Sequence, residues 1–177
     1  MGIIKLLKLG RQLRVKPENG QIFLNDTEVM ILPTEITEEL FISLNRVVGA
    51  GGASSSLYIA GKELSEPFFD ILKKMYGADI LNSEKKIKMA LEYFVPFIGF
   101  GRVEIIEVDL KKAHIIFKGQ DFPEVGITRS TDTQACHIVR GIFTGFMEIL
   151  TKTPCTGEET KCQAKGDEYC EFVINPS

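Results

Sequence analysis

The sequence of 177 residues contains no tryptophan, only two histidines and no long uninterrupted apolar stretch. Its apolar start is interrupted by Lys5, Lys8 and Arg11 and has no small-residue cleavage site, so it fits neither a signal peptide nor a membrane span. The 21 basic and 24 acidic residues are mixed along the chain without a basic stripe, which gives binding to nucleic-acid phosphates no electrostatic support. We expect a cytoplasmic protein with no membrane span and no nucleic-acid partner.

Several catalytic signatures are also missing. No serine lies in a nucleophile-elbow sequence that would belong to a Ser/His/Asp set. The glycine cluster at residues 49–52 lacks the preceding strand and the Lys-Ser/Thr pair of a phosphate-binding loop, so we interpret it as a turn between helices. There is no flavin or nicotinamide fingerprint. These absences count against an autonomous enzyme.

The residues that are present indicate a globular chain, with 44% hydrophobic and 25% charged residues. Short alternating stretches between Gln12 and Pro33 predict two or three strands, and apolar residues at steps of three and four predict helices up to about residue 95. The N-terminal helices are expected to end at the glycine cluster and at Gly77, and Thr34 and Ser83 are the expected caps.

After residue 98 the hydrophobic period changes from helical to alternating. Two strands are expected in 102–110 and 113–119, then a helix opened by a capping box at Thr131 and Gln134, then strands near 156–162 and 168–174. Gly141 and Gly145 share one face of that helix and would let it lie close to a neighbour. We predict an α+β fold of helices packed on a twisted antiparallel sheet.

We expect one domain over residues 1–177, with a helical part at about 1–98 and a sheet part at about 99–177.

All four cysteines lie in the last 42 residues of the chain. In a reducing cytosol such a cluster more often binds a metal or performs catalysis than forms disulfides. Cys136 falls in the first turns of the predicted helix, where the helix dipole stabilises a thiolate. Cys162 and Cys170 flank a turn-forming segment that contains Gly166-Asp167, so a hairpin could bring both sulfurs together.

Spacing alone leaves the fourth ligand open. Glu159 could supply an oxygen, but Cys155 is a rival because residues four apart lie on the same face of a strand. His137 is a weaker rival, since its side chain would point about 100° away from that of Cys136 around the helix. Zn²⁺ accepts both cysteine sulfur and carboxylate oxygen, and four protein ligands would make it structural.

The stretch ACHIVRGIFTGFMEILTKTPCTGEETKCQAKGDEYCEFVI resembles the C-terminal signature of the 4-vinyl reductase domain family. The segments GFGRVEIIEVD and VVGAGGASSSLYIAGKEL are similar to that family as well. The resemblance implies a fold related to subunits of the TRAPP vesicle-tethering complex, often dimeric, and a zinc ion beside a pocket for small apolar molecules. Matched residue by residue, it places the ligands at Cys136, Glu159, Cys162 and Cys170 and leaves Cys155 out.

The lack of tryptophan counts against phenol sensing by this chain, because the resemblance implies polar and tryptophan side chains around a phenol. A more apolar ligand suits the sequence better. Aromatic and aliphatic residues flank the expected interface between the sheet and the helices, and they are the candidate lining of a pocket: Phe94, Phe97, Phe100, Ile115, Phe117, Phe143 and Phe146.

Three functions therefore compete. The first is a module, expected to be a homodimer, that binds or senses a small apolar molecule and carries a structural zinc site. The second is a scaffold or assembly subunit, which a filled core and an exposed apolar surface would favour. The third is an accessory protein of tetrapyrrole vinyl reduction.

Overall fold

The computed structural model describes residues 13–77, 79–80, 83–128 and 134–177. The apolar start of the chain and the capping residue Thr131 lie outside the described residues. Within those ranges, no helix combines the length and apolar character that a membrane crossing requires.

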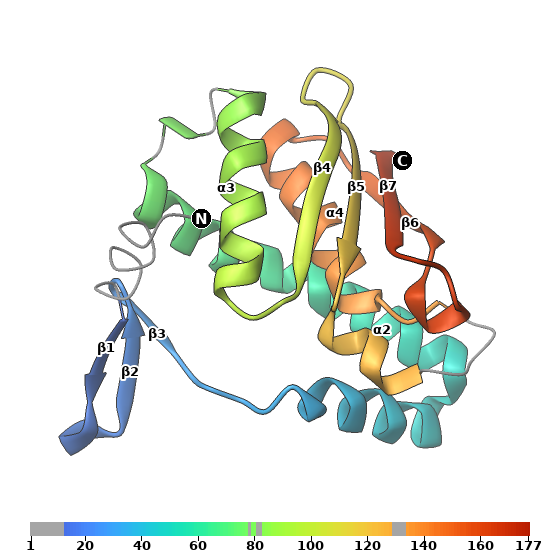
Figure 1. Cartoon of the computed structure of the whole chain (residues 1–177), viewed down its shortest axis with the longest axis horizontal. Helices are drawn as coiled ribbons and strands as arrows, with labels where there is room; N and C mark the ends of the chain where they lie inside the picture. The colour runs from blue at the N-terminus through green and yellow to red at the C-terminus, as the bar shows by residue number, and fades with distance from the viewer. Residues whose placement is uncertain (1–12, 78, 81–82, 129–133) are drawn as a thin grey trace.

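The N-terminal segment forms a small antiparallel sheet in the order β1-β2-β3 (Figure 1), with β1 Leu13–Lys16, β2 Gln21–Leu24 and β3 Thr27–Val29. Leu24 is the only fully buried residue of these three strands. The third strand ends at Val29, whereas the sequence predicted that it would include Met30–Leu32. These three residues are exposed and have no partner strand, so they form an extended connection instead.

The long helix α2 (Glu35–Tyr76) consists of two helical parts that meet at Gly49. Gly49 has φ 75° and ψ 166°, a conformation that favours glycine, so the predicted break at the glycine cluster is confirmed. The helix ends at Gly77, also as predicted. Thr34 and Ser83 occupy the N-cap positions of α2 and of α3 (Glu84–Phe97), but neither side chain makes a capping hydrogen bond.

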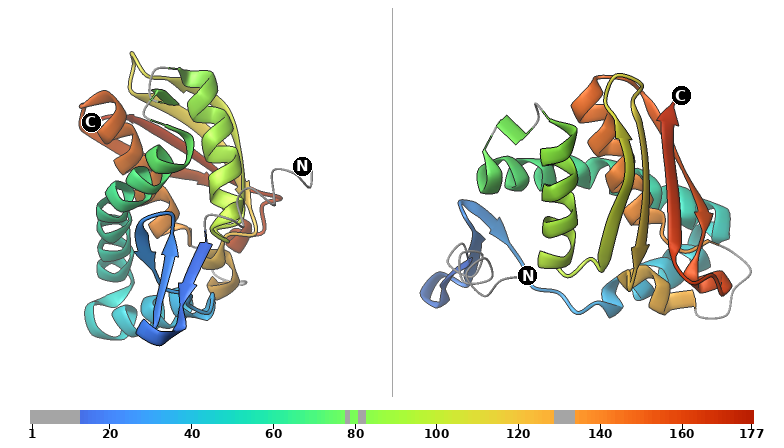
Figure 2. Two further views of the ribbon diagram at one scale, coloured as in Figure 1. Left: turned by 90° about the vertical axis from the view of Figure 1, so that its left-hand side faces the viewer. Right: turned by 45° about the horizontal axis from the view of Figure 1, so that its top comes forward.

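The second sheet has four strands, all antiparallel, in the order β4-β5-β7-β6. Figures 1 and 2 show helix α4 lying against one face of this sheet and α2 packed on the far side of α4. The predicted α+β fold is therefore confirmed. The bounds of these elements are β4 Arg102–Asp109, β5 His114–Gln120, α4 His137–Thr151, β6 Cys155–Lys161 and β7 Cys170–Pro176.

Helices α2 and α4 approach each other closely through glycines. A Cβ atom on Gly141 would lie 2.2 Å from the carbonyl oxygen of Tyr58, and one on Gly145 would lie 2.7 Å from that of Lys62. Real Cβ atoms do not tolerate such distances, so only glycine allows this separation of the helices. The close approach predicted from Gly141 and Gly145 is confirmed, and Gly61 contributes to it from α2.

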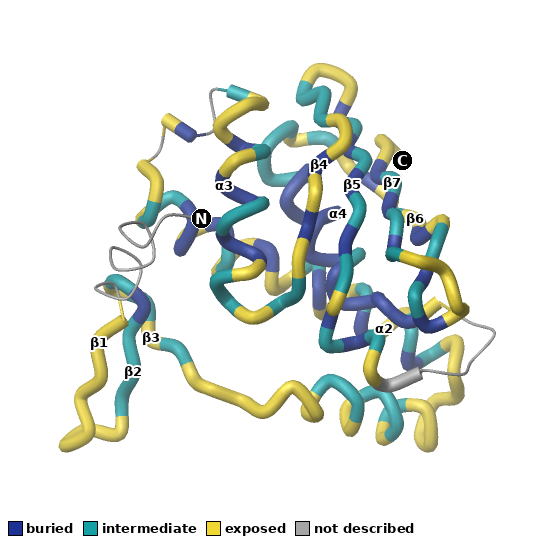
Figure 3. Tube along the Cα trace, viewed as in Figure 1, coloured by how far each residue is buried: buried dark blue, intermediate teal, exposed yellow. Residues whose placement is uncertain are grey.

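The core lies between the sheet and α4 (Figure 3). Inward-facing residues alternate along β5 and β7, as period-two burial requires. Phe117 of β5 stacks on Phe143 of α4 with ring centroids 3.9 Å apart, and on Phe172 of β7 at 4.6 Å. These buried aromatic contacts fix α4 over the centre of the sheet.

Candidate metal centre and apolar void

Four side chains from three segments meet at the N-terminal end of α4. The sulfurs of Cys136, Cys162 and Cys170 and a carboxylate oxygen of Glu159 all lie within 4.8 Å of one another, and all four residues are buried. The sulfurs of Cys136 and Cys170 are 3.6 Å apart. The structure thus brings together the four residues to which the family resemblance assigned metal binding.

A β-bulge explains why Glu159 and Cys162 reach the same point. In a regular strand, residues three apart face opposite sides. The pairing of β6 with β7 shifts between Glu159 and Lys161, which adds one residue and changes the direction of the side chains that follow. Glu159 and Cys162 consequently both face α4.

The loop after β6 holds the two C-terminal cysteines in place. The Asp167 carboxylate accepts a hydrogen bond from the Cys162 N–H at 2.8 Å, and the Gln163 N–H donates to the Cys170 sulfur at 3.3 Å. Gly166 has φ 95° and ends the short 3-10 helix η4 (Gln163–Lys165). The hairpin predicted between Cys162 and Cys170 is present, with Asp167 acting in its turn.

Cys155 is also buried, but it lies at the far end of β6 from the cluster. Four residues of extended strand separate it from Glu159, which corresponds to about 13 Å. Its sulfur lies 3.3 Å from the Thr153 carbonyl oxygen, and it is not a member of the cluster. His137 points elsewhere too: its Nε2 lies 3.0 Å from the Ser54 hydroxyl, and its ring stacks on Phe41. Same-face spacing favoured Cys155 equally because it ignores distance along the strand.

The four acidic groups perturb one another strongly. Hydrogen bonds from Cys136 and Cys170 lower the pKa of the Cys162 thiol well below its usual range. Hydrogen bonding to Cys162 and then to Cys170 raises the pKa of Cys136. Burial, followed by the hydrogen bond to Cys162, raises the pKa of Glu159 to about 8. Without a cation the cluster can hold little negative charge, because each ionised group disfavours the next.

The cluster fits a metal ion by its donor set and by one unsatisfied atom. One Glu159 oxygen, Oε2, accepts the Cys136 N–H at 3.2 Å, while the other, Oε1, is buried and has no hydrogen-bond partner. A buried carboxylate oxygen without a partner is costly, and a cation would satisfy it. Three thiols with one carboxylate suit a thiophilic divalent ion such as Zn²⁺.

Glu124 is a functional candidate that the sequence did not single out. It lies in the 3-10 helix η3 (Pro123–Thr128), is 2% exposed, and accepts hydrogen bonds from the backbone N–H groups of Ile138 and Val139 at 2.7 and 2.9 Å. Burial raises its pKa to about 7. One glutamate in a short loop gives no sequence signal for this position, since the contact depends on where the loop meets α4.

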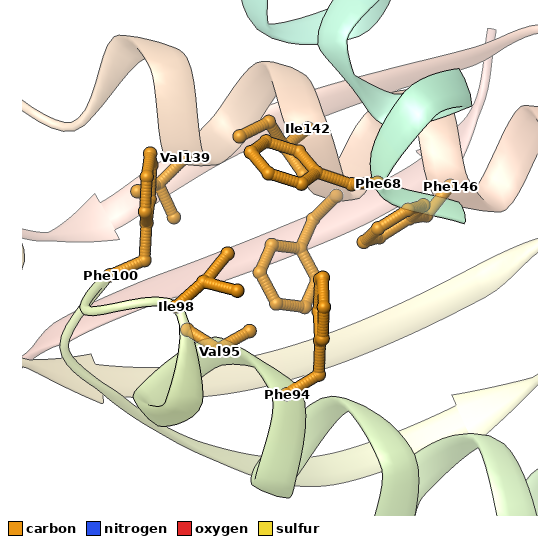
Figure 4. A pocket seen from close by; sticks show the side chains of 9 residues that line it. Phe68, Phe94, Val95, Ile98, Phe100, Val139, Ile142 and Phe146 are labelled. Carbon is orange, nitrogen blue, oxygen red and sulfur yellow. The ribbon is translucent and has the colours of Figure 1, made fainter. Parts of the chain in front are cut away.

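A small apolar void lies beside the middle of α4 (Figure 4). Its volume is about 10 Å³, at the lower limit for one water molecule, and every lining side chain is a hydrocarbon. The lining residues come from α2, α3, the loop after α3, and α4: Phe68, Phe94, Val95, Ile98, Phe100, Val139, Ile142, Phe143 and Phe146.

The candidate pocket residues therefore separate into two groups. Phe94, Phe100, Phe143 and Phe146 line the void, whereas Phe97, Ile115 and Phe117 do not. Ile115 and Phe117 are buried in the sheet core, and Phe97 is half-buried. Residues Phe68, Val139 and Ile142 complete the lining.

Phe146 also borders a second apolar void of about 20 Å³ between α2, α3 and α4. A larger open hollow of about 490 Å³ lies near Thr34, Asp121 and Asp167. That hollow includes polar side chains and is open to solvent, so it does not suit an apolar ligand.

The comparisons with known proteins agree with this architecture. Residues 116–176 match the family model of the 4-vinyl reductase domain, which confirms the resemblance seen in the sequence. An uncharacterized protein of Methanocaldococcus jannaschii is 25% identical over 177 residues, which cover 98% of this chain and 95% of that protein. A second uncharacterized protein of the same organism is 27% identical over 123 residues, which cover 68% of this chain and 49% of that protein.

Three solved structures share the fold. The phenol-responsive sensory domain of the transcription activator PoxR, crystallised with phenol, has a TM-score of 0.82 at 21% identity and covers 99% of this chain and 91% of its own. A vinyl-4-reductase family protein of M. jannaschii has a TM-score of 0.55 at 18% identity, covering 84% of each chain. Subunit 3 of the trafficking protein particle complex of Naegleria fowleri, covalently bound to palmitic acid, scores 0.55 at 13% identity, covering 82% of this chain and 97% of its own.

Proposed function

We propose that this protein binds and senses a small apolar molecule in the void beside α4, while Zn²⁺ in the four-residue cluster acts as a structural clamp. The observation that carries the proposal is the all-hydrocarbon void, which lies along the same helix that supplies Cys136 to the cluster. The shared fold with a sensory domain crystallised with phenol supports a ligand at this kind of interface.

The lining favours a ligand without polar groups. Because no polar side chain lines the void, a phenolic hydroxyl placed there would lose its hydrogen bonds to water without replacement. That loss costs roughly 1–3 kcal/mol, or about 5- to 150-fold in affinity. We therefore expect toluene to bind more tightly than phenol.

The void must enlarge before it can hold a ring. Ile98, Phe68 and Phe100 line it and are only half-buried, whereas the other lining side chains are fully buried. The rings of Phe68 and Phe100 meet edge to face with centroids 5.9 Å apart. Displacing these three side chains is the shortest way to admit a ligand from solvent.

The proposed zinc clamp would join three segments that have no disulfide between them. Cys136 precedes α4, Glu159 lies in β6, and Cys162 and Cys170 flank the β6–β7 connection. Zinc would neutralise the thiolates and the buried carboxylate, and four protein ligands would leave no position for a reacting water. The proposed role is therefore structural rather than catalytic.

Elemental analysis and native mass spectrometry of the purified chain, followed by calorimetric titration with toluene and phenol, would test the proposal. We expect about one zinc per chain and tighter binding of toluene. Ile142→Phe should abolish binding by filling the void. Ile106→Phe, the same change on the exposed face of β4, should not. Equal binding of toluene by both variants would place the ligand elsewhere, and absence of zinc would remove the clamp.

A second candidate function is assembly, favoured by the exposed apolar connection after β3. Met30, Ile31 and Leu32 are 76%, 74% and 50% exposed, and the nearby strands bury little. A second copy of the chain covering this segment would give the expected homodimer. Light scattering should show a dimer that Ile31→Asp converts to a monomer; a monomeric wild-type chain would contradict it.

A further inference from the structure

We propose that the first turn of α4 couples the metal centre to the apolar void, so that metal and ligand each bind more tightly when the other is present, and that Glu124 is the positioning residue for this coupling. The inference rests on the proposed function, because it concerns the regulation of the same void.

The two sites share one turn of helix. Cys136 is the N-cap residue of α4 and belongs to the cluster. Val139 follows three residues later and lines the void, and Ile142 and Phe143 line it one turn further on. A displacement of this turn therefore changes the position of a metal ligand and the shape of the void together.

Two buried carboxylates hold this turn by its backbone. Glu159 accepts the N–H of Cys136, and Glu124 accepts those of Ile138 and Val139. N–H groups at a helix start have no partner within the helix, so such acceptors decide its position. Across the described ranges, neither carboxylate forms an ion pair. Their contacts are made with the start of α4.

The two carboxylates hold opposite ends of the linkage. Glu159 belongs to the cluster, so metal binding would fix it together with Cys136. Glu124 belongs to η3 and holds Val139, whose side chain meets the ligand space. Metal that orders this turn in advance lowers the ordering cost of ligand binding, and by linkage the ligand raises metal affinity by the same factor.

A purely structural Glu124 predicts a different result. If it only capped the helix, its loss would weaken the fold and change both affinities without changing their dependence on each other. The quantity that distinguishes the two cases is the ratio of zinc affinities with and without ligand.

The experiment uses the zinc-loaded chain and a chromophoric chelator that competes for zinc, with and without saturating toluene; toluene binding itself is measured separately by calorimetry. We expect toluene to raise zinc affinity roughly tenfold in the wild type. Glu124→Gln, whose amide group cannot accept both N–H groups, should bring the ratio close to one. Glu66→Gln, an exposed change on α2, should keep the wild-type ratio.

Each outcome bears on a separate claim. If toluene binds but leaves zinc affinity unchanged, the coupling is wrong while the proposed function stands. If toluene does not bind the wild type, both are wrong. If folded Glu124→Gln keeps the full ratio, Glu124 has no part in the coupling. Should that variant not fold, Glu124→Asp, which keeps the charge but has a shorter reach, is expected to lower the ratio, and an unchanged ratio would again overturn the role of Glu124.

Discussion

The N-terminal end of α4 and its middle lie in contrasting surroundings. At the N-terminal end, three thiols and two carboxylates are buried together, and an unsatisfied Glu159 oxygen calls for a cation. Along the middle, the helix borders a void with no polar side chain at all. The polar end is specified by a few residues whose chemistry is recognisable in isolation, whereas the apolar region depends on how tightly many similar side chains pack.

Loss of a cluster cysteine should have the largest effect on this contrast. Cys162→Ser should lower the zinc content from about one per chain to none and destabilise the fold severely, because structural zinc contributes on the order of 10 kcal/mol. Elemental analysis and thermal unfolding measure both effects.

Cys155→Ser is the matched control, since Cys155 is buried in the same strand but lies outside the cluster. It should retain zinc. An empty site in that variant, or a full one in Cys162→Ser, would show that the ligand assignment is wrong.

Removal of a void-lining ring should affect only the apolar region. Phe146 is 3% exposed and borders both voids, so Phe146→Ala should join them and cost about 3–5 kcal/mol of unfolding free energy. Urea unfolding gives the cost, and titration should show that naphthalene now binds. Zinc content should stay at the wild-type level; loss of zinc would mean that the two regions are not separable. Phe97→Ala, half-buried and outside the void, should cost less.

The pH dependence of stability should report on Glu124. Its pKa is raised by burial to about 7, so the folded protein retains a proton that the unfolded chain loses at lower pH. The free energy of unfolding should therefore fall as pH rises from about 4.5 to 7, by up to roughly 3 kcal/mol.

Glu124→Gln has no such titration and should show a flatter profile than the wild type in urea unfolding at pH 5 to 8. Glu66→Gln should keep the wild-type slope. Identical slopes in all three proteins would contradict a raised pKa at Glu124.

The smallest expected effect concerns the contact that holds α2 against α4. Gly141→Ala places a Cβ 2.2 Å from the Tyr58 carbonyl oxygen and should cost about 1–3 kcal/mol by forcing the helices apart. Gly51→Ala, where nothing lies within 4 Å of the added Cβ, should be neutral or slightly stabilising. Equal effects in urea unfolding would mean that the close packing is not what requires glycine at 141.

The strands and helices could be predicted where a local pattern specifies them. Alternation identified β4 and β5, and Gly49 and Gly77 marked where helices end. Prediction was wrong for residues 30–32, where strand-like side chains have no strand beside them. Hydrophobic pattern reports a tendency to be buried, but a strand also needs a partner for its backbone.

The candidate metal centre was predictable only in part. Clustered cysteines indicated a metal, but spacing left Cys155 and Glu159 as alternatives, and the family resemblance favoured Glu159. The bulge at Glu159–Lys161 explains the failure of spacing, since one extra residue reverses the parity on which a strand-face argument depends.

The sequence by itself determined the helical and strand segments, the chemistry of the cysteine-rich end and the apolar character of the interior, because each depends on residue type and local order. Tertiary structure decided that Glu159 joins the three thiols, that Glu124 holds the start of α4, and that the interior leaves two voids of about 10 and 20 Å³. These features depend on distances between segments far apart in the chain, and packing in three dimensions sets such distances.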